Sequence, residues 1–130
     1  MLAPVHLAAL FTHLNSLDTI INVTSGLAFV PISKVSIYCA TKAFLRSFTL
    51  SLRHQLKSAK IEVIEMIPPA LNTDLGGKGI HDAYPPVSEF VESVFRQMKE
   101  GKTELTFGTS VDRANANNEA IAEYFKRMNP

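Results

Sequence analysis

The sequence predicts an α/β fold in which a parallel sheet of three strands carries about four helices on its faces. Short apolar segments rich in β-branched residues alternate along the chain with longer segments of helical periodicity. Two strands joined by a helical segment are expected to lie parallel, with a right-handed connection. The chain has 130 residues, of which 46% are hydrophobic, and is expected to form a single domain (1–130) around one core.

The first half of the chain is expected to contain two helices with a strand between them. The first helix covers Leu2–Leu14, and the strand covers Thr19–Thr24. A connecting loop, Gly26–Val35, carries apolar residues that are expected to line a pocket. The longest helix, Ser36–Lys57, has apolar residues four positions apart, and Ser36 is expected to cap its first turn.

The second half of the chain repeats this alternation. The segment Ile61–Ile67 is apolar in five of seven positions, which is typical of a strand covered on both faces. Asn72–Pro86 is polar and rich in glycine and proline, as expected of a flexible flap. An amphipathic helix (86–98) and a third strand, Lys102–Phe107, follow. A last helix is expected to be capped by Asp112 and to end near Met128.

Composition argues against several classes of protein. The net charge of +1, with scattered charges, gives no reason to expect nucleic acid or a membrane surface as a partner. No apolar run approaches membrane-spanning length, and the N-terminal segment lacks the basic leader of a signal peptide. A single cysteine, Cys39, excludes an internal disulfide and fits a cytoplasmic location. His6 and His13 have no cysteine or acidic partner nearby, so no metal site is predicted.

Three residues, Ser25, Tyr38 and Lys42, have the order and spacing of a proton-relay site for carbonyl and alcohol chemistry. Ser25 ends the first strand, at the sheet edge where open parallel sheets bind ligands. Tyr38 and Lys42 are four residues apart and should share one helix face, one turn from each other. The alternative is structural: a tyrosine near a helix start is often a packing residue, and such a lysine is often solvated.

The chemistry explains why these three side chains are suited to one site. A free phenol ionises near pH ~10, and lowering that value by ~3 units requires about 4 kcal/mol in favour of the phenolate. One ammonium group ~4 Å away supplies about this much at an effective dielectric constant of 20. Lys42 could therefore make Tyr38 a working acid and base, while Ser25 would hydrogen-bond the substrate oxygen.

Three segments resemble the short-chain dehydrogenase/reductase family: Ile21–Gly26, Tyr38–Ala43 and Pro68–Thr73. They are similar to its catalytic-serine strand, its Tyr-x-x-x-Lys helix start and its proline turn. The resemblance implies a partial Rossmann-like, doubly wound parallel sheet, with NAD or NADP as cofactor and a small alcohol or carbonyl compound as substrate. It implies that Tyr38 is the acid/base, that Ser25 orients the substrate and that Lys42 also binds the nicotinamide ribose. Pro68 and Thr73 would lie beside the nicotinamide.

The chain departs from the family pattern in its nucleotide-binding part. The strand, Gly-x-x-x-Gly-x-Gly turn and helix that hold the pyrophosphate have no match here. The only glycine cluster, Gly76–Gly79, is expected to be a mobile loop and not a phosphate site. The family's further catalytic asparagine has no counterpart near the first helix (1–14), and Pro69 stands where glycine is usual. The chain therefore resembles the catalytic half of the family fold.

Two functional hypotheses follow from this resemblance. The first is an NAD(P)-dependent oxidoreductase that interconverts an alcohol and a ketone or aldehyde. The second is a non-catalytic remnant whose helices mediate association. Under either hypothesis the chain is expected to form a homo-oligomer through helices 2–14 and 36–57, because these resemble the helices through which family members dimerise.

Overall fold

A computed structural model describes residues 2–14 and 17–130 of the chain. Its centre is a parallel sheet of three strands in the order β1-β2-β3. β1 covers Thr19–Val23, β2 covers Glu62–Ile67 and β3 covers Glu104–Thr106. The predicted α/β fold with three strands is confirmed, although the third strand is shorter than the segment that the sequence suggested.

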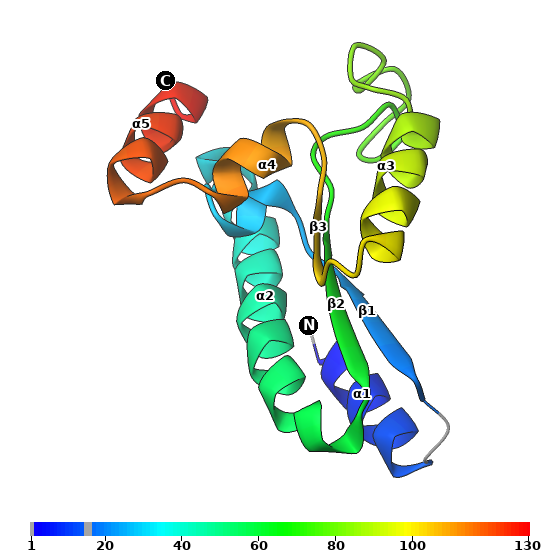
Figure 1. The fold of residues 1–130 in the computed structure, drawn as a ribbon. Coiled ribbons are helices and arrows are strands. Elements are labelled where there is room, and N and C mark those ends of the chain that lie inside the picture. Colours follow the sequence, from blue (N-terminus) through cyan, green and yellow to red (C-terminus); the bar gives the residue numbers. More distant parts are fainter. Residues whose placement is uncertain (1, 15–16) are drawn as a thin grey trace.

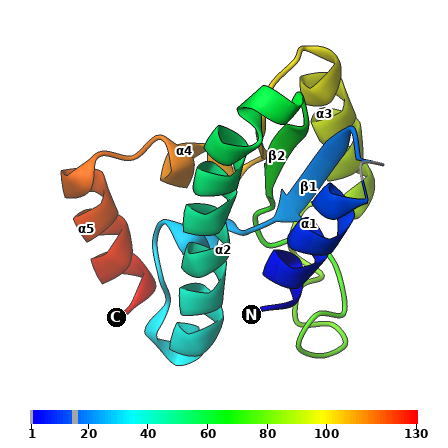
Figure 2. The same cartoon turned by 90° about the horizontal axis from the view of Figure 1, so that it is seen from below.

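Helices cover both faces of this sheet. α1 and α2 lie on one face and α3 lies on the other, while α4 and α5 follow β3 past one end of α2 (Figures 1 and 2). The described residues form five α-helices, one more than expected: α1 Ala3–His13, α2 Ser36–Gln55, α3 Val87–Lys99, α4 Thr109–Ala114 and α5 Asn118–Met128.

Side chains of β2 build a core on each face of the sheet, because successive residues of a strand point to opposite sides. On the α1 and α2 side, Val63 packs with Leu52, Leu56 and Ala8. On the α3 side, Ile64 belongs to a second buried cluster with Phe90, Val94 and Leu105. This arrangement explains why the strand is apolar at adjacent positions, as the sequence suggested.

The predicted single helix from Asp112 to Met128 is wrong. The structure divides this segment into α4 and α5, and Asp112 lies inside α4 instead of capping a helix. Asn117 caps α5, because its side-chain oxygen accepts a hydrogen bond from the backbone N–H of Ala120 at 2.9 Å. Asparagine competes for backbone hydrogen bonds in this way, which favours a helix start over a helix interior.

The predicted cap at Ser36 is also wrong. Val35 occupies the cap position of α2, with φ −131° and ψ 43°, and no side chain caps the first turn. Ser36 is instead the first helical residue. The chain enters the helix directly from a short 3-10 turn, Ser33–Val35.

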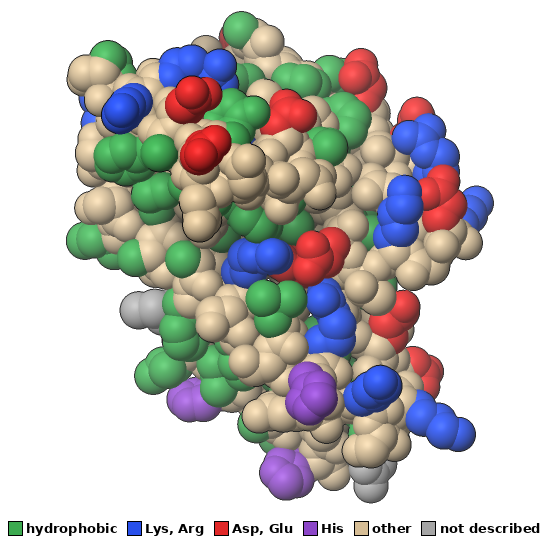
Figure 3. Space-filling view, turned by 60° about the vertical axis from the view of Figure 1, so that its left-hand side comes forward, with side chains coloured by type: hydrophobic (Ala, Val, Ile, Leu, Met, Phe, Trp, Pro, Cys, Tyr) green, Lys and Arg blue, Asp and Glu red, His purple; other side chains and the backbone are tan. Residues whose placement is uncertain are grey.

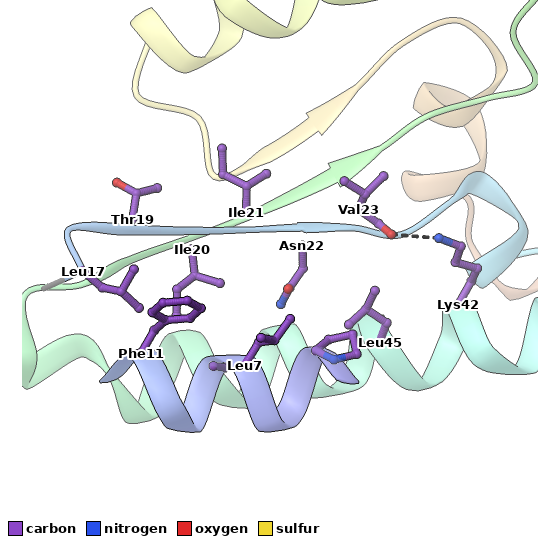
Figure 4. A pocket seen from close by; sticks show the side chains of 12 residues that line it. Leu7, Phe11, Leu17, Thr19, Ile20, Ile21, Asn22, Val23, Lys42 and Leu45 are labelled. Atoms are coloured by element: carbon purple, nitrogen blue, oxygen red, sulfur yellow. Dashed lines mark hydrogen bonds between the residues drawn. The ribbon is translucent and has the colours of Figure 1, made fainter. Parts of the chain in front are cut away.

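The outer edge of β1 carries no neighbouring strand among the residues that the structure describes. Ile20 and Asn22 point toward α1 and α2, whereas Ile21 and Val23 point to the other face of the sheet (Figure 4). Ile21 is 42% exposed and Val23 is 46% exposed, because α3 covers β2 and β3 but not β1. One edge and one face of this strand are therefore open.

The surface carries charges of both signs. On the face shown in Figure 3, lysine and arginine side chains lie among aspartate and glutamate side chains and do not gather into one basic patch. In the part of the chain that the structure describes, no helix combines the length and the apolar character needed to cross a membrane.

Candidate active site

Ser25 lies two residues after Val23, the last residue of β1. Its side-chain oxygen accepts a hydrogen bond from the backbone N–H of Leu27 at 3.1 Å and so caps the short turn Gly26–Ala28. The residue is 8% exposed. A serine hydroxyl has one proton to donate and two lone pairs, so this bond leaves Ser25 able to donate to a substrate oxygen.

The turn after β2 lies beside the end of β1. The backbone N–H of Gly26 donates to the carbonyl of Pro68 at 3.2 Å, and that of Thr24 donates to the carbonyl of Met66 at 2.8 Å. These bonds join the segment after β1 to the turn after β2 at the carboxyl edge of the sheet. This edge is where open parallel sheets bind their ligands.

Tyr38 and Lys42 lie on one face of α2, near its first turns. The Lys42 Nζ atom is 5.6 Å from the centre of the Tyr38 ring. Tyr38 is 39% exposed, so its ring is open to solvent on one side. The four-residue spacing therefore places the two side chains on one helix face, with the ammonium group over the tyrosine ring.

Lys42 also connects α2 to β1 through a hydrogen bond. Its Nζ atom donates a hydrogen bond to the carbonyl of Val23 at 2.9 Å, two residues before Ser25 (Figure 4). The side chain is half-buried, and this burial lowers its pKa below the usual lysine value because a charged amine is less well solvated there. Lys42 thus has contacts with both elements that carry the candidate site.

An apolar groove of about 500 Å³ runs between α1, β1 and α2, with Lys42 at one end (Figure 4). We call it the α1–β1 groove. Its walls are largely aliphatic and aromatic, and the lining residues include Leu7, Phe11, Leu17, Ile20 and Leu45. The groove therefore places apolar side chains beside Lys42.

Thr73 lies farther from this centre, in the loop that follows β2. It is exposed, and its hydroxyl accepts a hydrogen bond from the backbone N–H of Leu75 at 3.4 Å. The loop closes on itself where the N–H of Asn72 donates to the carbonyl of Pro85 at 2.9 Å. Within the described chain, Thr73 makes no hydrogen bond with Ser25, Tyr38 or Lys42.

Arg113 of α4 covers the strand end from the other side. A Cβ atom on Gly26 would come within 3.3 Å of the Arg113 side chain, so the position favours a residue without one. Burial, and then the nearby charge of Arg127, lower the pKa of Arg113. An arginine nevertheless stays charged at neutral pH, and Arg113 places a positive charge next to the residue that follows Ser25.

The C-terminal end of α5 holds the loop beside the site. The side chain of Asn129 accepts a hydrogen bond from the N–H of Ser33 at 2.6 Å and donates one to the carbonyl of Pro31 at 3.2 Å. The first of these bonds joins residues 96 positions apart. This loop leads from the Ser25 turn into α2, so α5 fixes one boundary of the candidate site.

A buried charge network beside the site was not anticipated from the sequence. Glu65 of β2 is fully buried, and its carboxylate contacts both Thr24 and Arg46. A glutamate at an inward-facing position of a strand, between Val63 and Ile67, is the signal that could have revealed it. Thr24 directly precedes Ser25, and Arg46 lies one turn after Lys42.

Metal-ligating side chains do not cluster in the part of the chain that the structure describes. It contains no group of three or more histidine, cysteine, aspartate or glutamate side chains that could hold an ion. Cys39 is buried and exchanges weak hydrogen bonds with the backbone of Ile32, at 3.4 Å and 3.7 Å. It is a packing residue, in agreement with the expectation from the sequence.

Comparison with known proteins assigns the family. The profile of the short chain dehydrogenase family matches residues 3–83, which include the strand, helix and turn described above. This chain belongs to the short-chain dehydrogenase family. It is 49% identical over 112 residues to "Uncharacterized oxidoreductase DltE" of Bacillus subtilis (strain 168), an alignment that covers 80% of this chain and 44% of the relative.

Solved structures of short-chain dehydrogenases share this fold. A short-chain dehydrogenase from Burkholderia cenocepacia J2315, in complex with NADP, superimposes with a TM-score of 0.80 at 24% identity, over 93% of this chain and 53% of the other. One from Sphingobium yanoikuyae, in complex with NADPH, superimposes with a TM-score of 0.65 at 26% identity, over 78% and 41%. The chain thus spans about half the length of these relatives, and the Rossmann-like fold is confirmed.

The lowered pKa of Lys42 has a measurable consequence. Between that pKa and the usual value of 10.5, the unfolded chain binds more protons at this position than the folded chain does. The contribution of Lys42 to the free energy of unfolding should therefore rise as the pH increases through this interval. NMR titration of ¹³C-dimethylated lysines should show the Lys42 resonance, assigned with Lys42→Met, titrating at lower pH in the folded chain than in urea. Identical titration in both states would contradict this prediction.

Proposed function

We propose that this chain forms the proton-transfer and substrate-orienting part of an NAD(P)-dependent oxidoreductase site. The reaction interconverts a small alcohol and a ketone or aldehyde. The observation that supports it best is the position of the Lys42 ammonium, 5.6 Å from the Tyr38 ring and bonded to the strand that ends at Ser25. Membership of the short-chain dehydrogenase family adds independent support.

Each side chain has one task in this proposal. When a carbonyl is reduced, Tyr38 donates its proton to the substrate oxygen, and in alcohol oxidation it accepts that proton. Lys42 favours the ionised phenol through its positive charge. Ser25 donates a hydrogen bond to the same oxygen and so holds the carbonyl against Tyr38. Because Tyr38 is open to solvent, water can restore its proton after each turnover.

A nicotinamide cofactor would supply or accept the hydride in this reaction. The residues present fit one end of such a molecule: Tyr38 and Lys42 suit the ribose, and Pro68 and Thr73 lie on the loop that follows the adjacent strand. The NADP and NADPH complexes of the two solved relatives support this choice of cofactor class. In the described part of the chain, no strand is followed by a glycine-rich turn that opens a helix, the arrangement that binds a pyrophosphate. We therefore expect weak binding.

Cofactor binding tests the proposal directly. Millimolar NADPH or NADH should raise the melting temperature of the purified chain, because a ligand that binds only the folded state stabilises it. At ten times the dissociation constant the gain is about 1.4 kcal/mol. Lys42→Met should reduce this shift, while Lys57→Met, just beyond the C-terminal end of α2, should leave it unchanged. If the chain shows no shift with either cofactor, it cannot catalyse the reaction unaided.

Association through helices 2–14 and 36–57 remains a prediction. α1 and the residue that caps its C-terminal end expose three large side chains, Leu7, Leu10 and Leu14, each more than half accessible. Apolar residues repeated at this spacing on one helix are suited to packing against another helix. A cytoplasmic location likewise remains a prediction.

A further inference from the structure

The last two residues of β1 and the residue that follows them are connected to α2 by side chains. The Asn22 amide donates to the Thr49 hydroxyl at 3.0 Å, and Lys42 donates to the carbonyl of Val23 at 2.9 Å. The third connection starts at Thr24 and runs through Glu65 of the neighbouring strand. These contacts join the end of the strand to one side of the helix, and Asn22 and Lys42 can be followed in Figure 4.

The Glu65 carboxylate uses both of its oxygen atoms. Oε1 accepts a hydrogen bond from the Thr24 hydroxyl at 2.7 Å, and Oε2 pairs with Nη1 of Arg46. Glu65 is 0% exposed and Thr24 is 1% exposed. A buried carboxylate is costly unless it is paired and hydrogen-bonded, and here the partners come from two different elements.

Arg46 extends this connection to the turn after Ser25. Its guanidinium group lies over the ring of Phe29, 4.1 Å from the ring centre, and Phe29 ends the turn that Ser25 caps. On α2, Arg46 follows Lys42 by four residues, and Lys42 follows Tyr38 by four. All three side chains therefore share one face of the helix.

We propose that Glu65 is a positioning residue for the candidate active site. Through Thr24 and Arg46 it holds the Ser25 hydroxyl at a fixed distance from the helix face that carries Tyr38 and Lys42. Glu65 does not contact substrate in this proposal. The inference depends on the proposed function for its catalytic consequence, but the structural consequence can be measured separately.

Glu65 could instead contribute only to the stability of the fold. The test must therefore separate its effect on the position of Ser25 from its effect on the melting temperature. Glu65→Gln leaves an amide against the Arg46 guanidinium, and this variant alone could fail to fold. The double variant Glu65→Leu with Arg46→Met removes both charges together, and buried ion pairs replaced in this way often keep or gain stability. Glu104→Gln is the matched control. Glu104 also lies near Arg46, at 3.8 Å, but has no contact with the strand end.

The double variant should melt at or above the temperature of the unsubstituted chain and yet show turnover reduced about tenfold, with cofactor affinity nearly unchanged. The Leu27 amide, which is bonded to Ser25, should exchange its hydrogen about tenfold faster in this variant, and the Glu104→Gln control should change neither property. Full turnover together with unchanged Leu27 exchange in a stable double variant would overturn the proposal. If the unsubstituted chain has no turnover, the proposed function fails, and Leu27 exchange alone decides whether Glu65 positions Ser25.

Discussion

Replacing Tyr38 with phenylalanine is expected to abolish turnover while leaving cofactor affinity nearly intact. The substitution removes one oxygen atom and with it the proton that we assign to the substrate oxygen. Positioned acid–base groups contribute about 10²- to 10⁴-fold to rate. The ring and its contact with Lys42 remain, so the part of the site that would face the ribose changes little. Consumption of NADPH with a panel of small ketones measures the effect, and thermal shift measures cofactor binding.

Tyr124→Phe provides the control for this experiment. Tyr124 lies on α5, where its ring stacks on Arg127 with 5.0 Å between the guanidinium and the ring centre. Removing its hydroxyl should leave turnover unchanged. Retained activity in Tyr38→Phe, at equal protein stability, would show that another group transfers the proton and would remove the central assignment of the proposed site.

Lysine substitutions at Ile21 and Val23 are expected to abolish the part of self-association that occurs through the open edge of β1. Both side chains are exposed on the open face of β1, next to a strand edge that pairs with no other strand of residues 2–14 and 17–130. Such edges pair with other chains, and charged residues prevent this. Burial of an isoleucine-sized side chain contributes about 1.5–3 kcal/mol, so the two changes together should weaken self-association by about a hundredfold or more. Analytical ultracentrifugation over a concentration series measures this.

Ile80→Lys is the matched control for the open edge. Ile80 is 62% exposed but lies in the loop between β2 and α3, outside the strand edge and outside helices 2–14 and 36–57, so the same substitution there should not change the mass distribution. The unsubstituted chain should be aggregated or oligomeric at micromolar concentration. A monomeric sample of the unsubstituted chain that melts cooperatively would contradict the prediction.

The alternation of strands and helices could be predicted because each element repeats its apolar residues with a distinct period. β2 shows this well, since Val63 and Ile64 pack on opposite faces of the sheet. The end of the chain could not be predicted in the same way. Three asparagines, at positions 115, 117 and 118, lie at the junction of the last two helices, but asparagine also occurs inside helices, and only the cap formed by Asn117 shows that a new helix begins there.

The pairing of Tyr38 with Lys42 could be predicted from helix geometry alone, because residues four apart share a face. The Glu65 network could not be, since it joins residues 41 and 19 positions apart that meet only when the sheet and α2 are assembled. For Thr73, the element could be predicted from the sequence but the position of the side chain could not. Its position after β2 was clear from the sequence, but the course of a loop rich in glycine and proline depends on contacts that no local pattern encodes.

The bonds of Asn129 to Ser33 and Pro31 join the segment after α5 to the loop that leads into α2. A substitution at Asn129 would therefore loosen this loop, and with it the approach to the first turn of α2, without altering any of the groups to which we assign proton transfer.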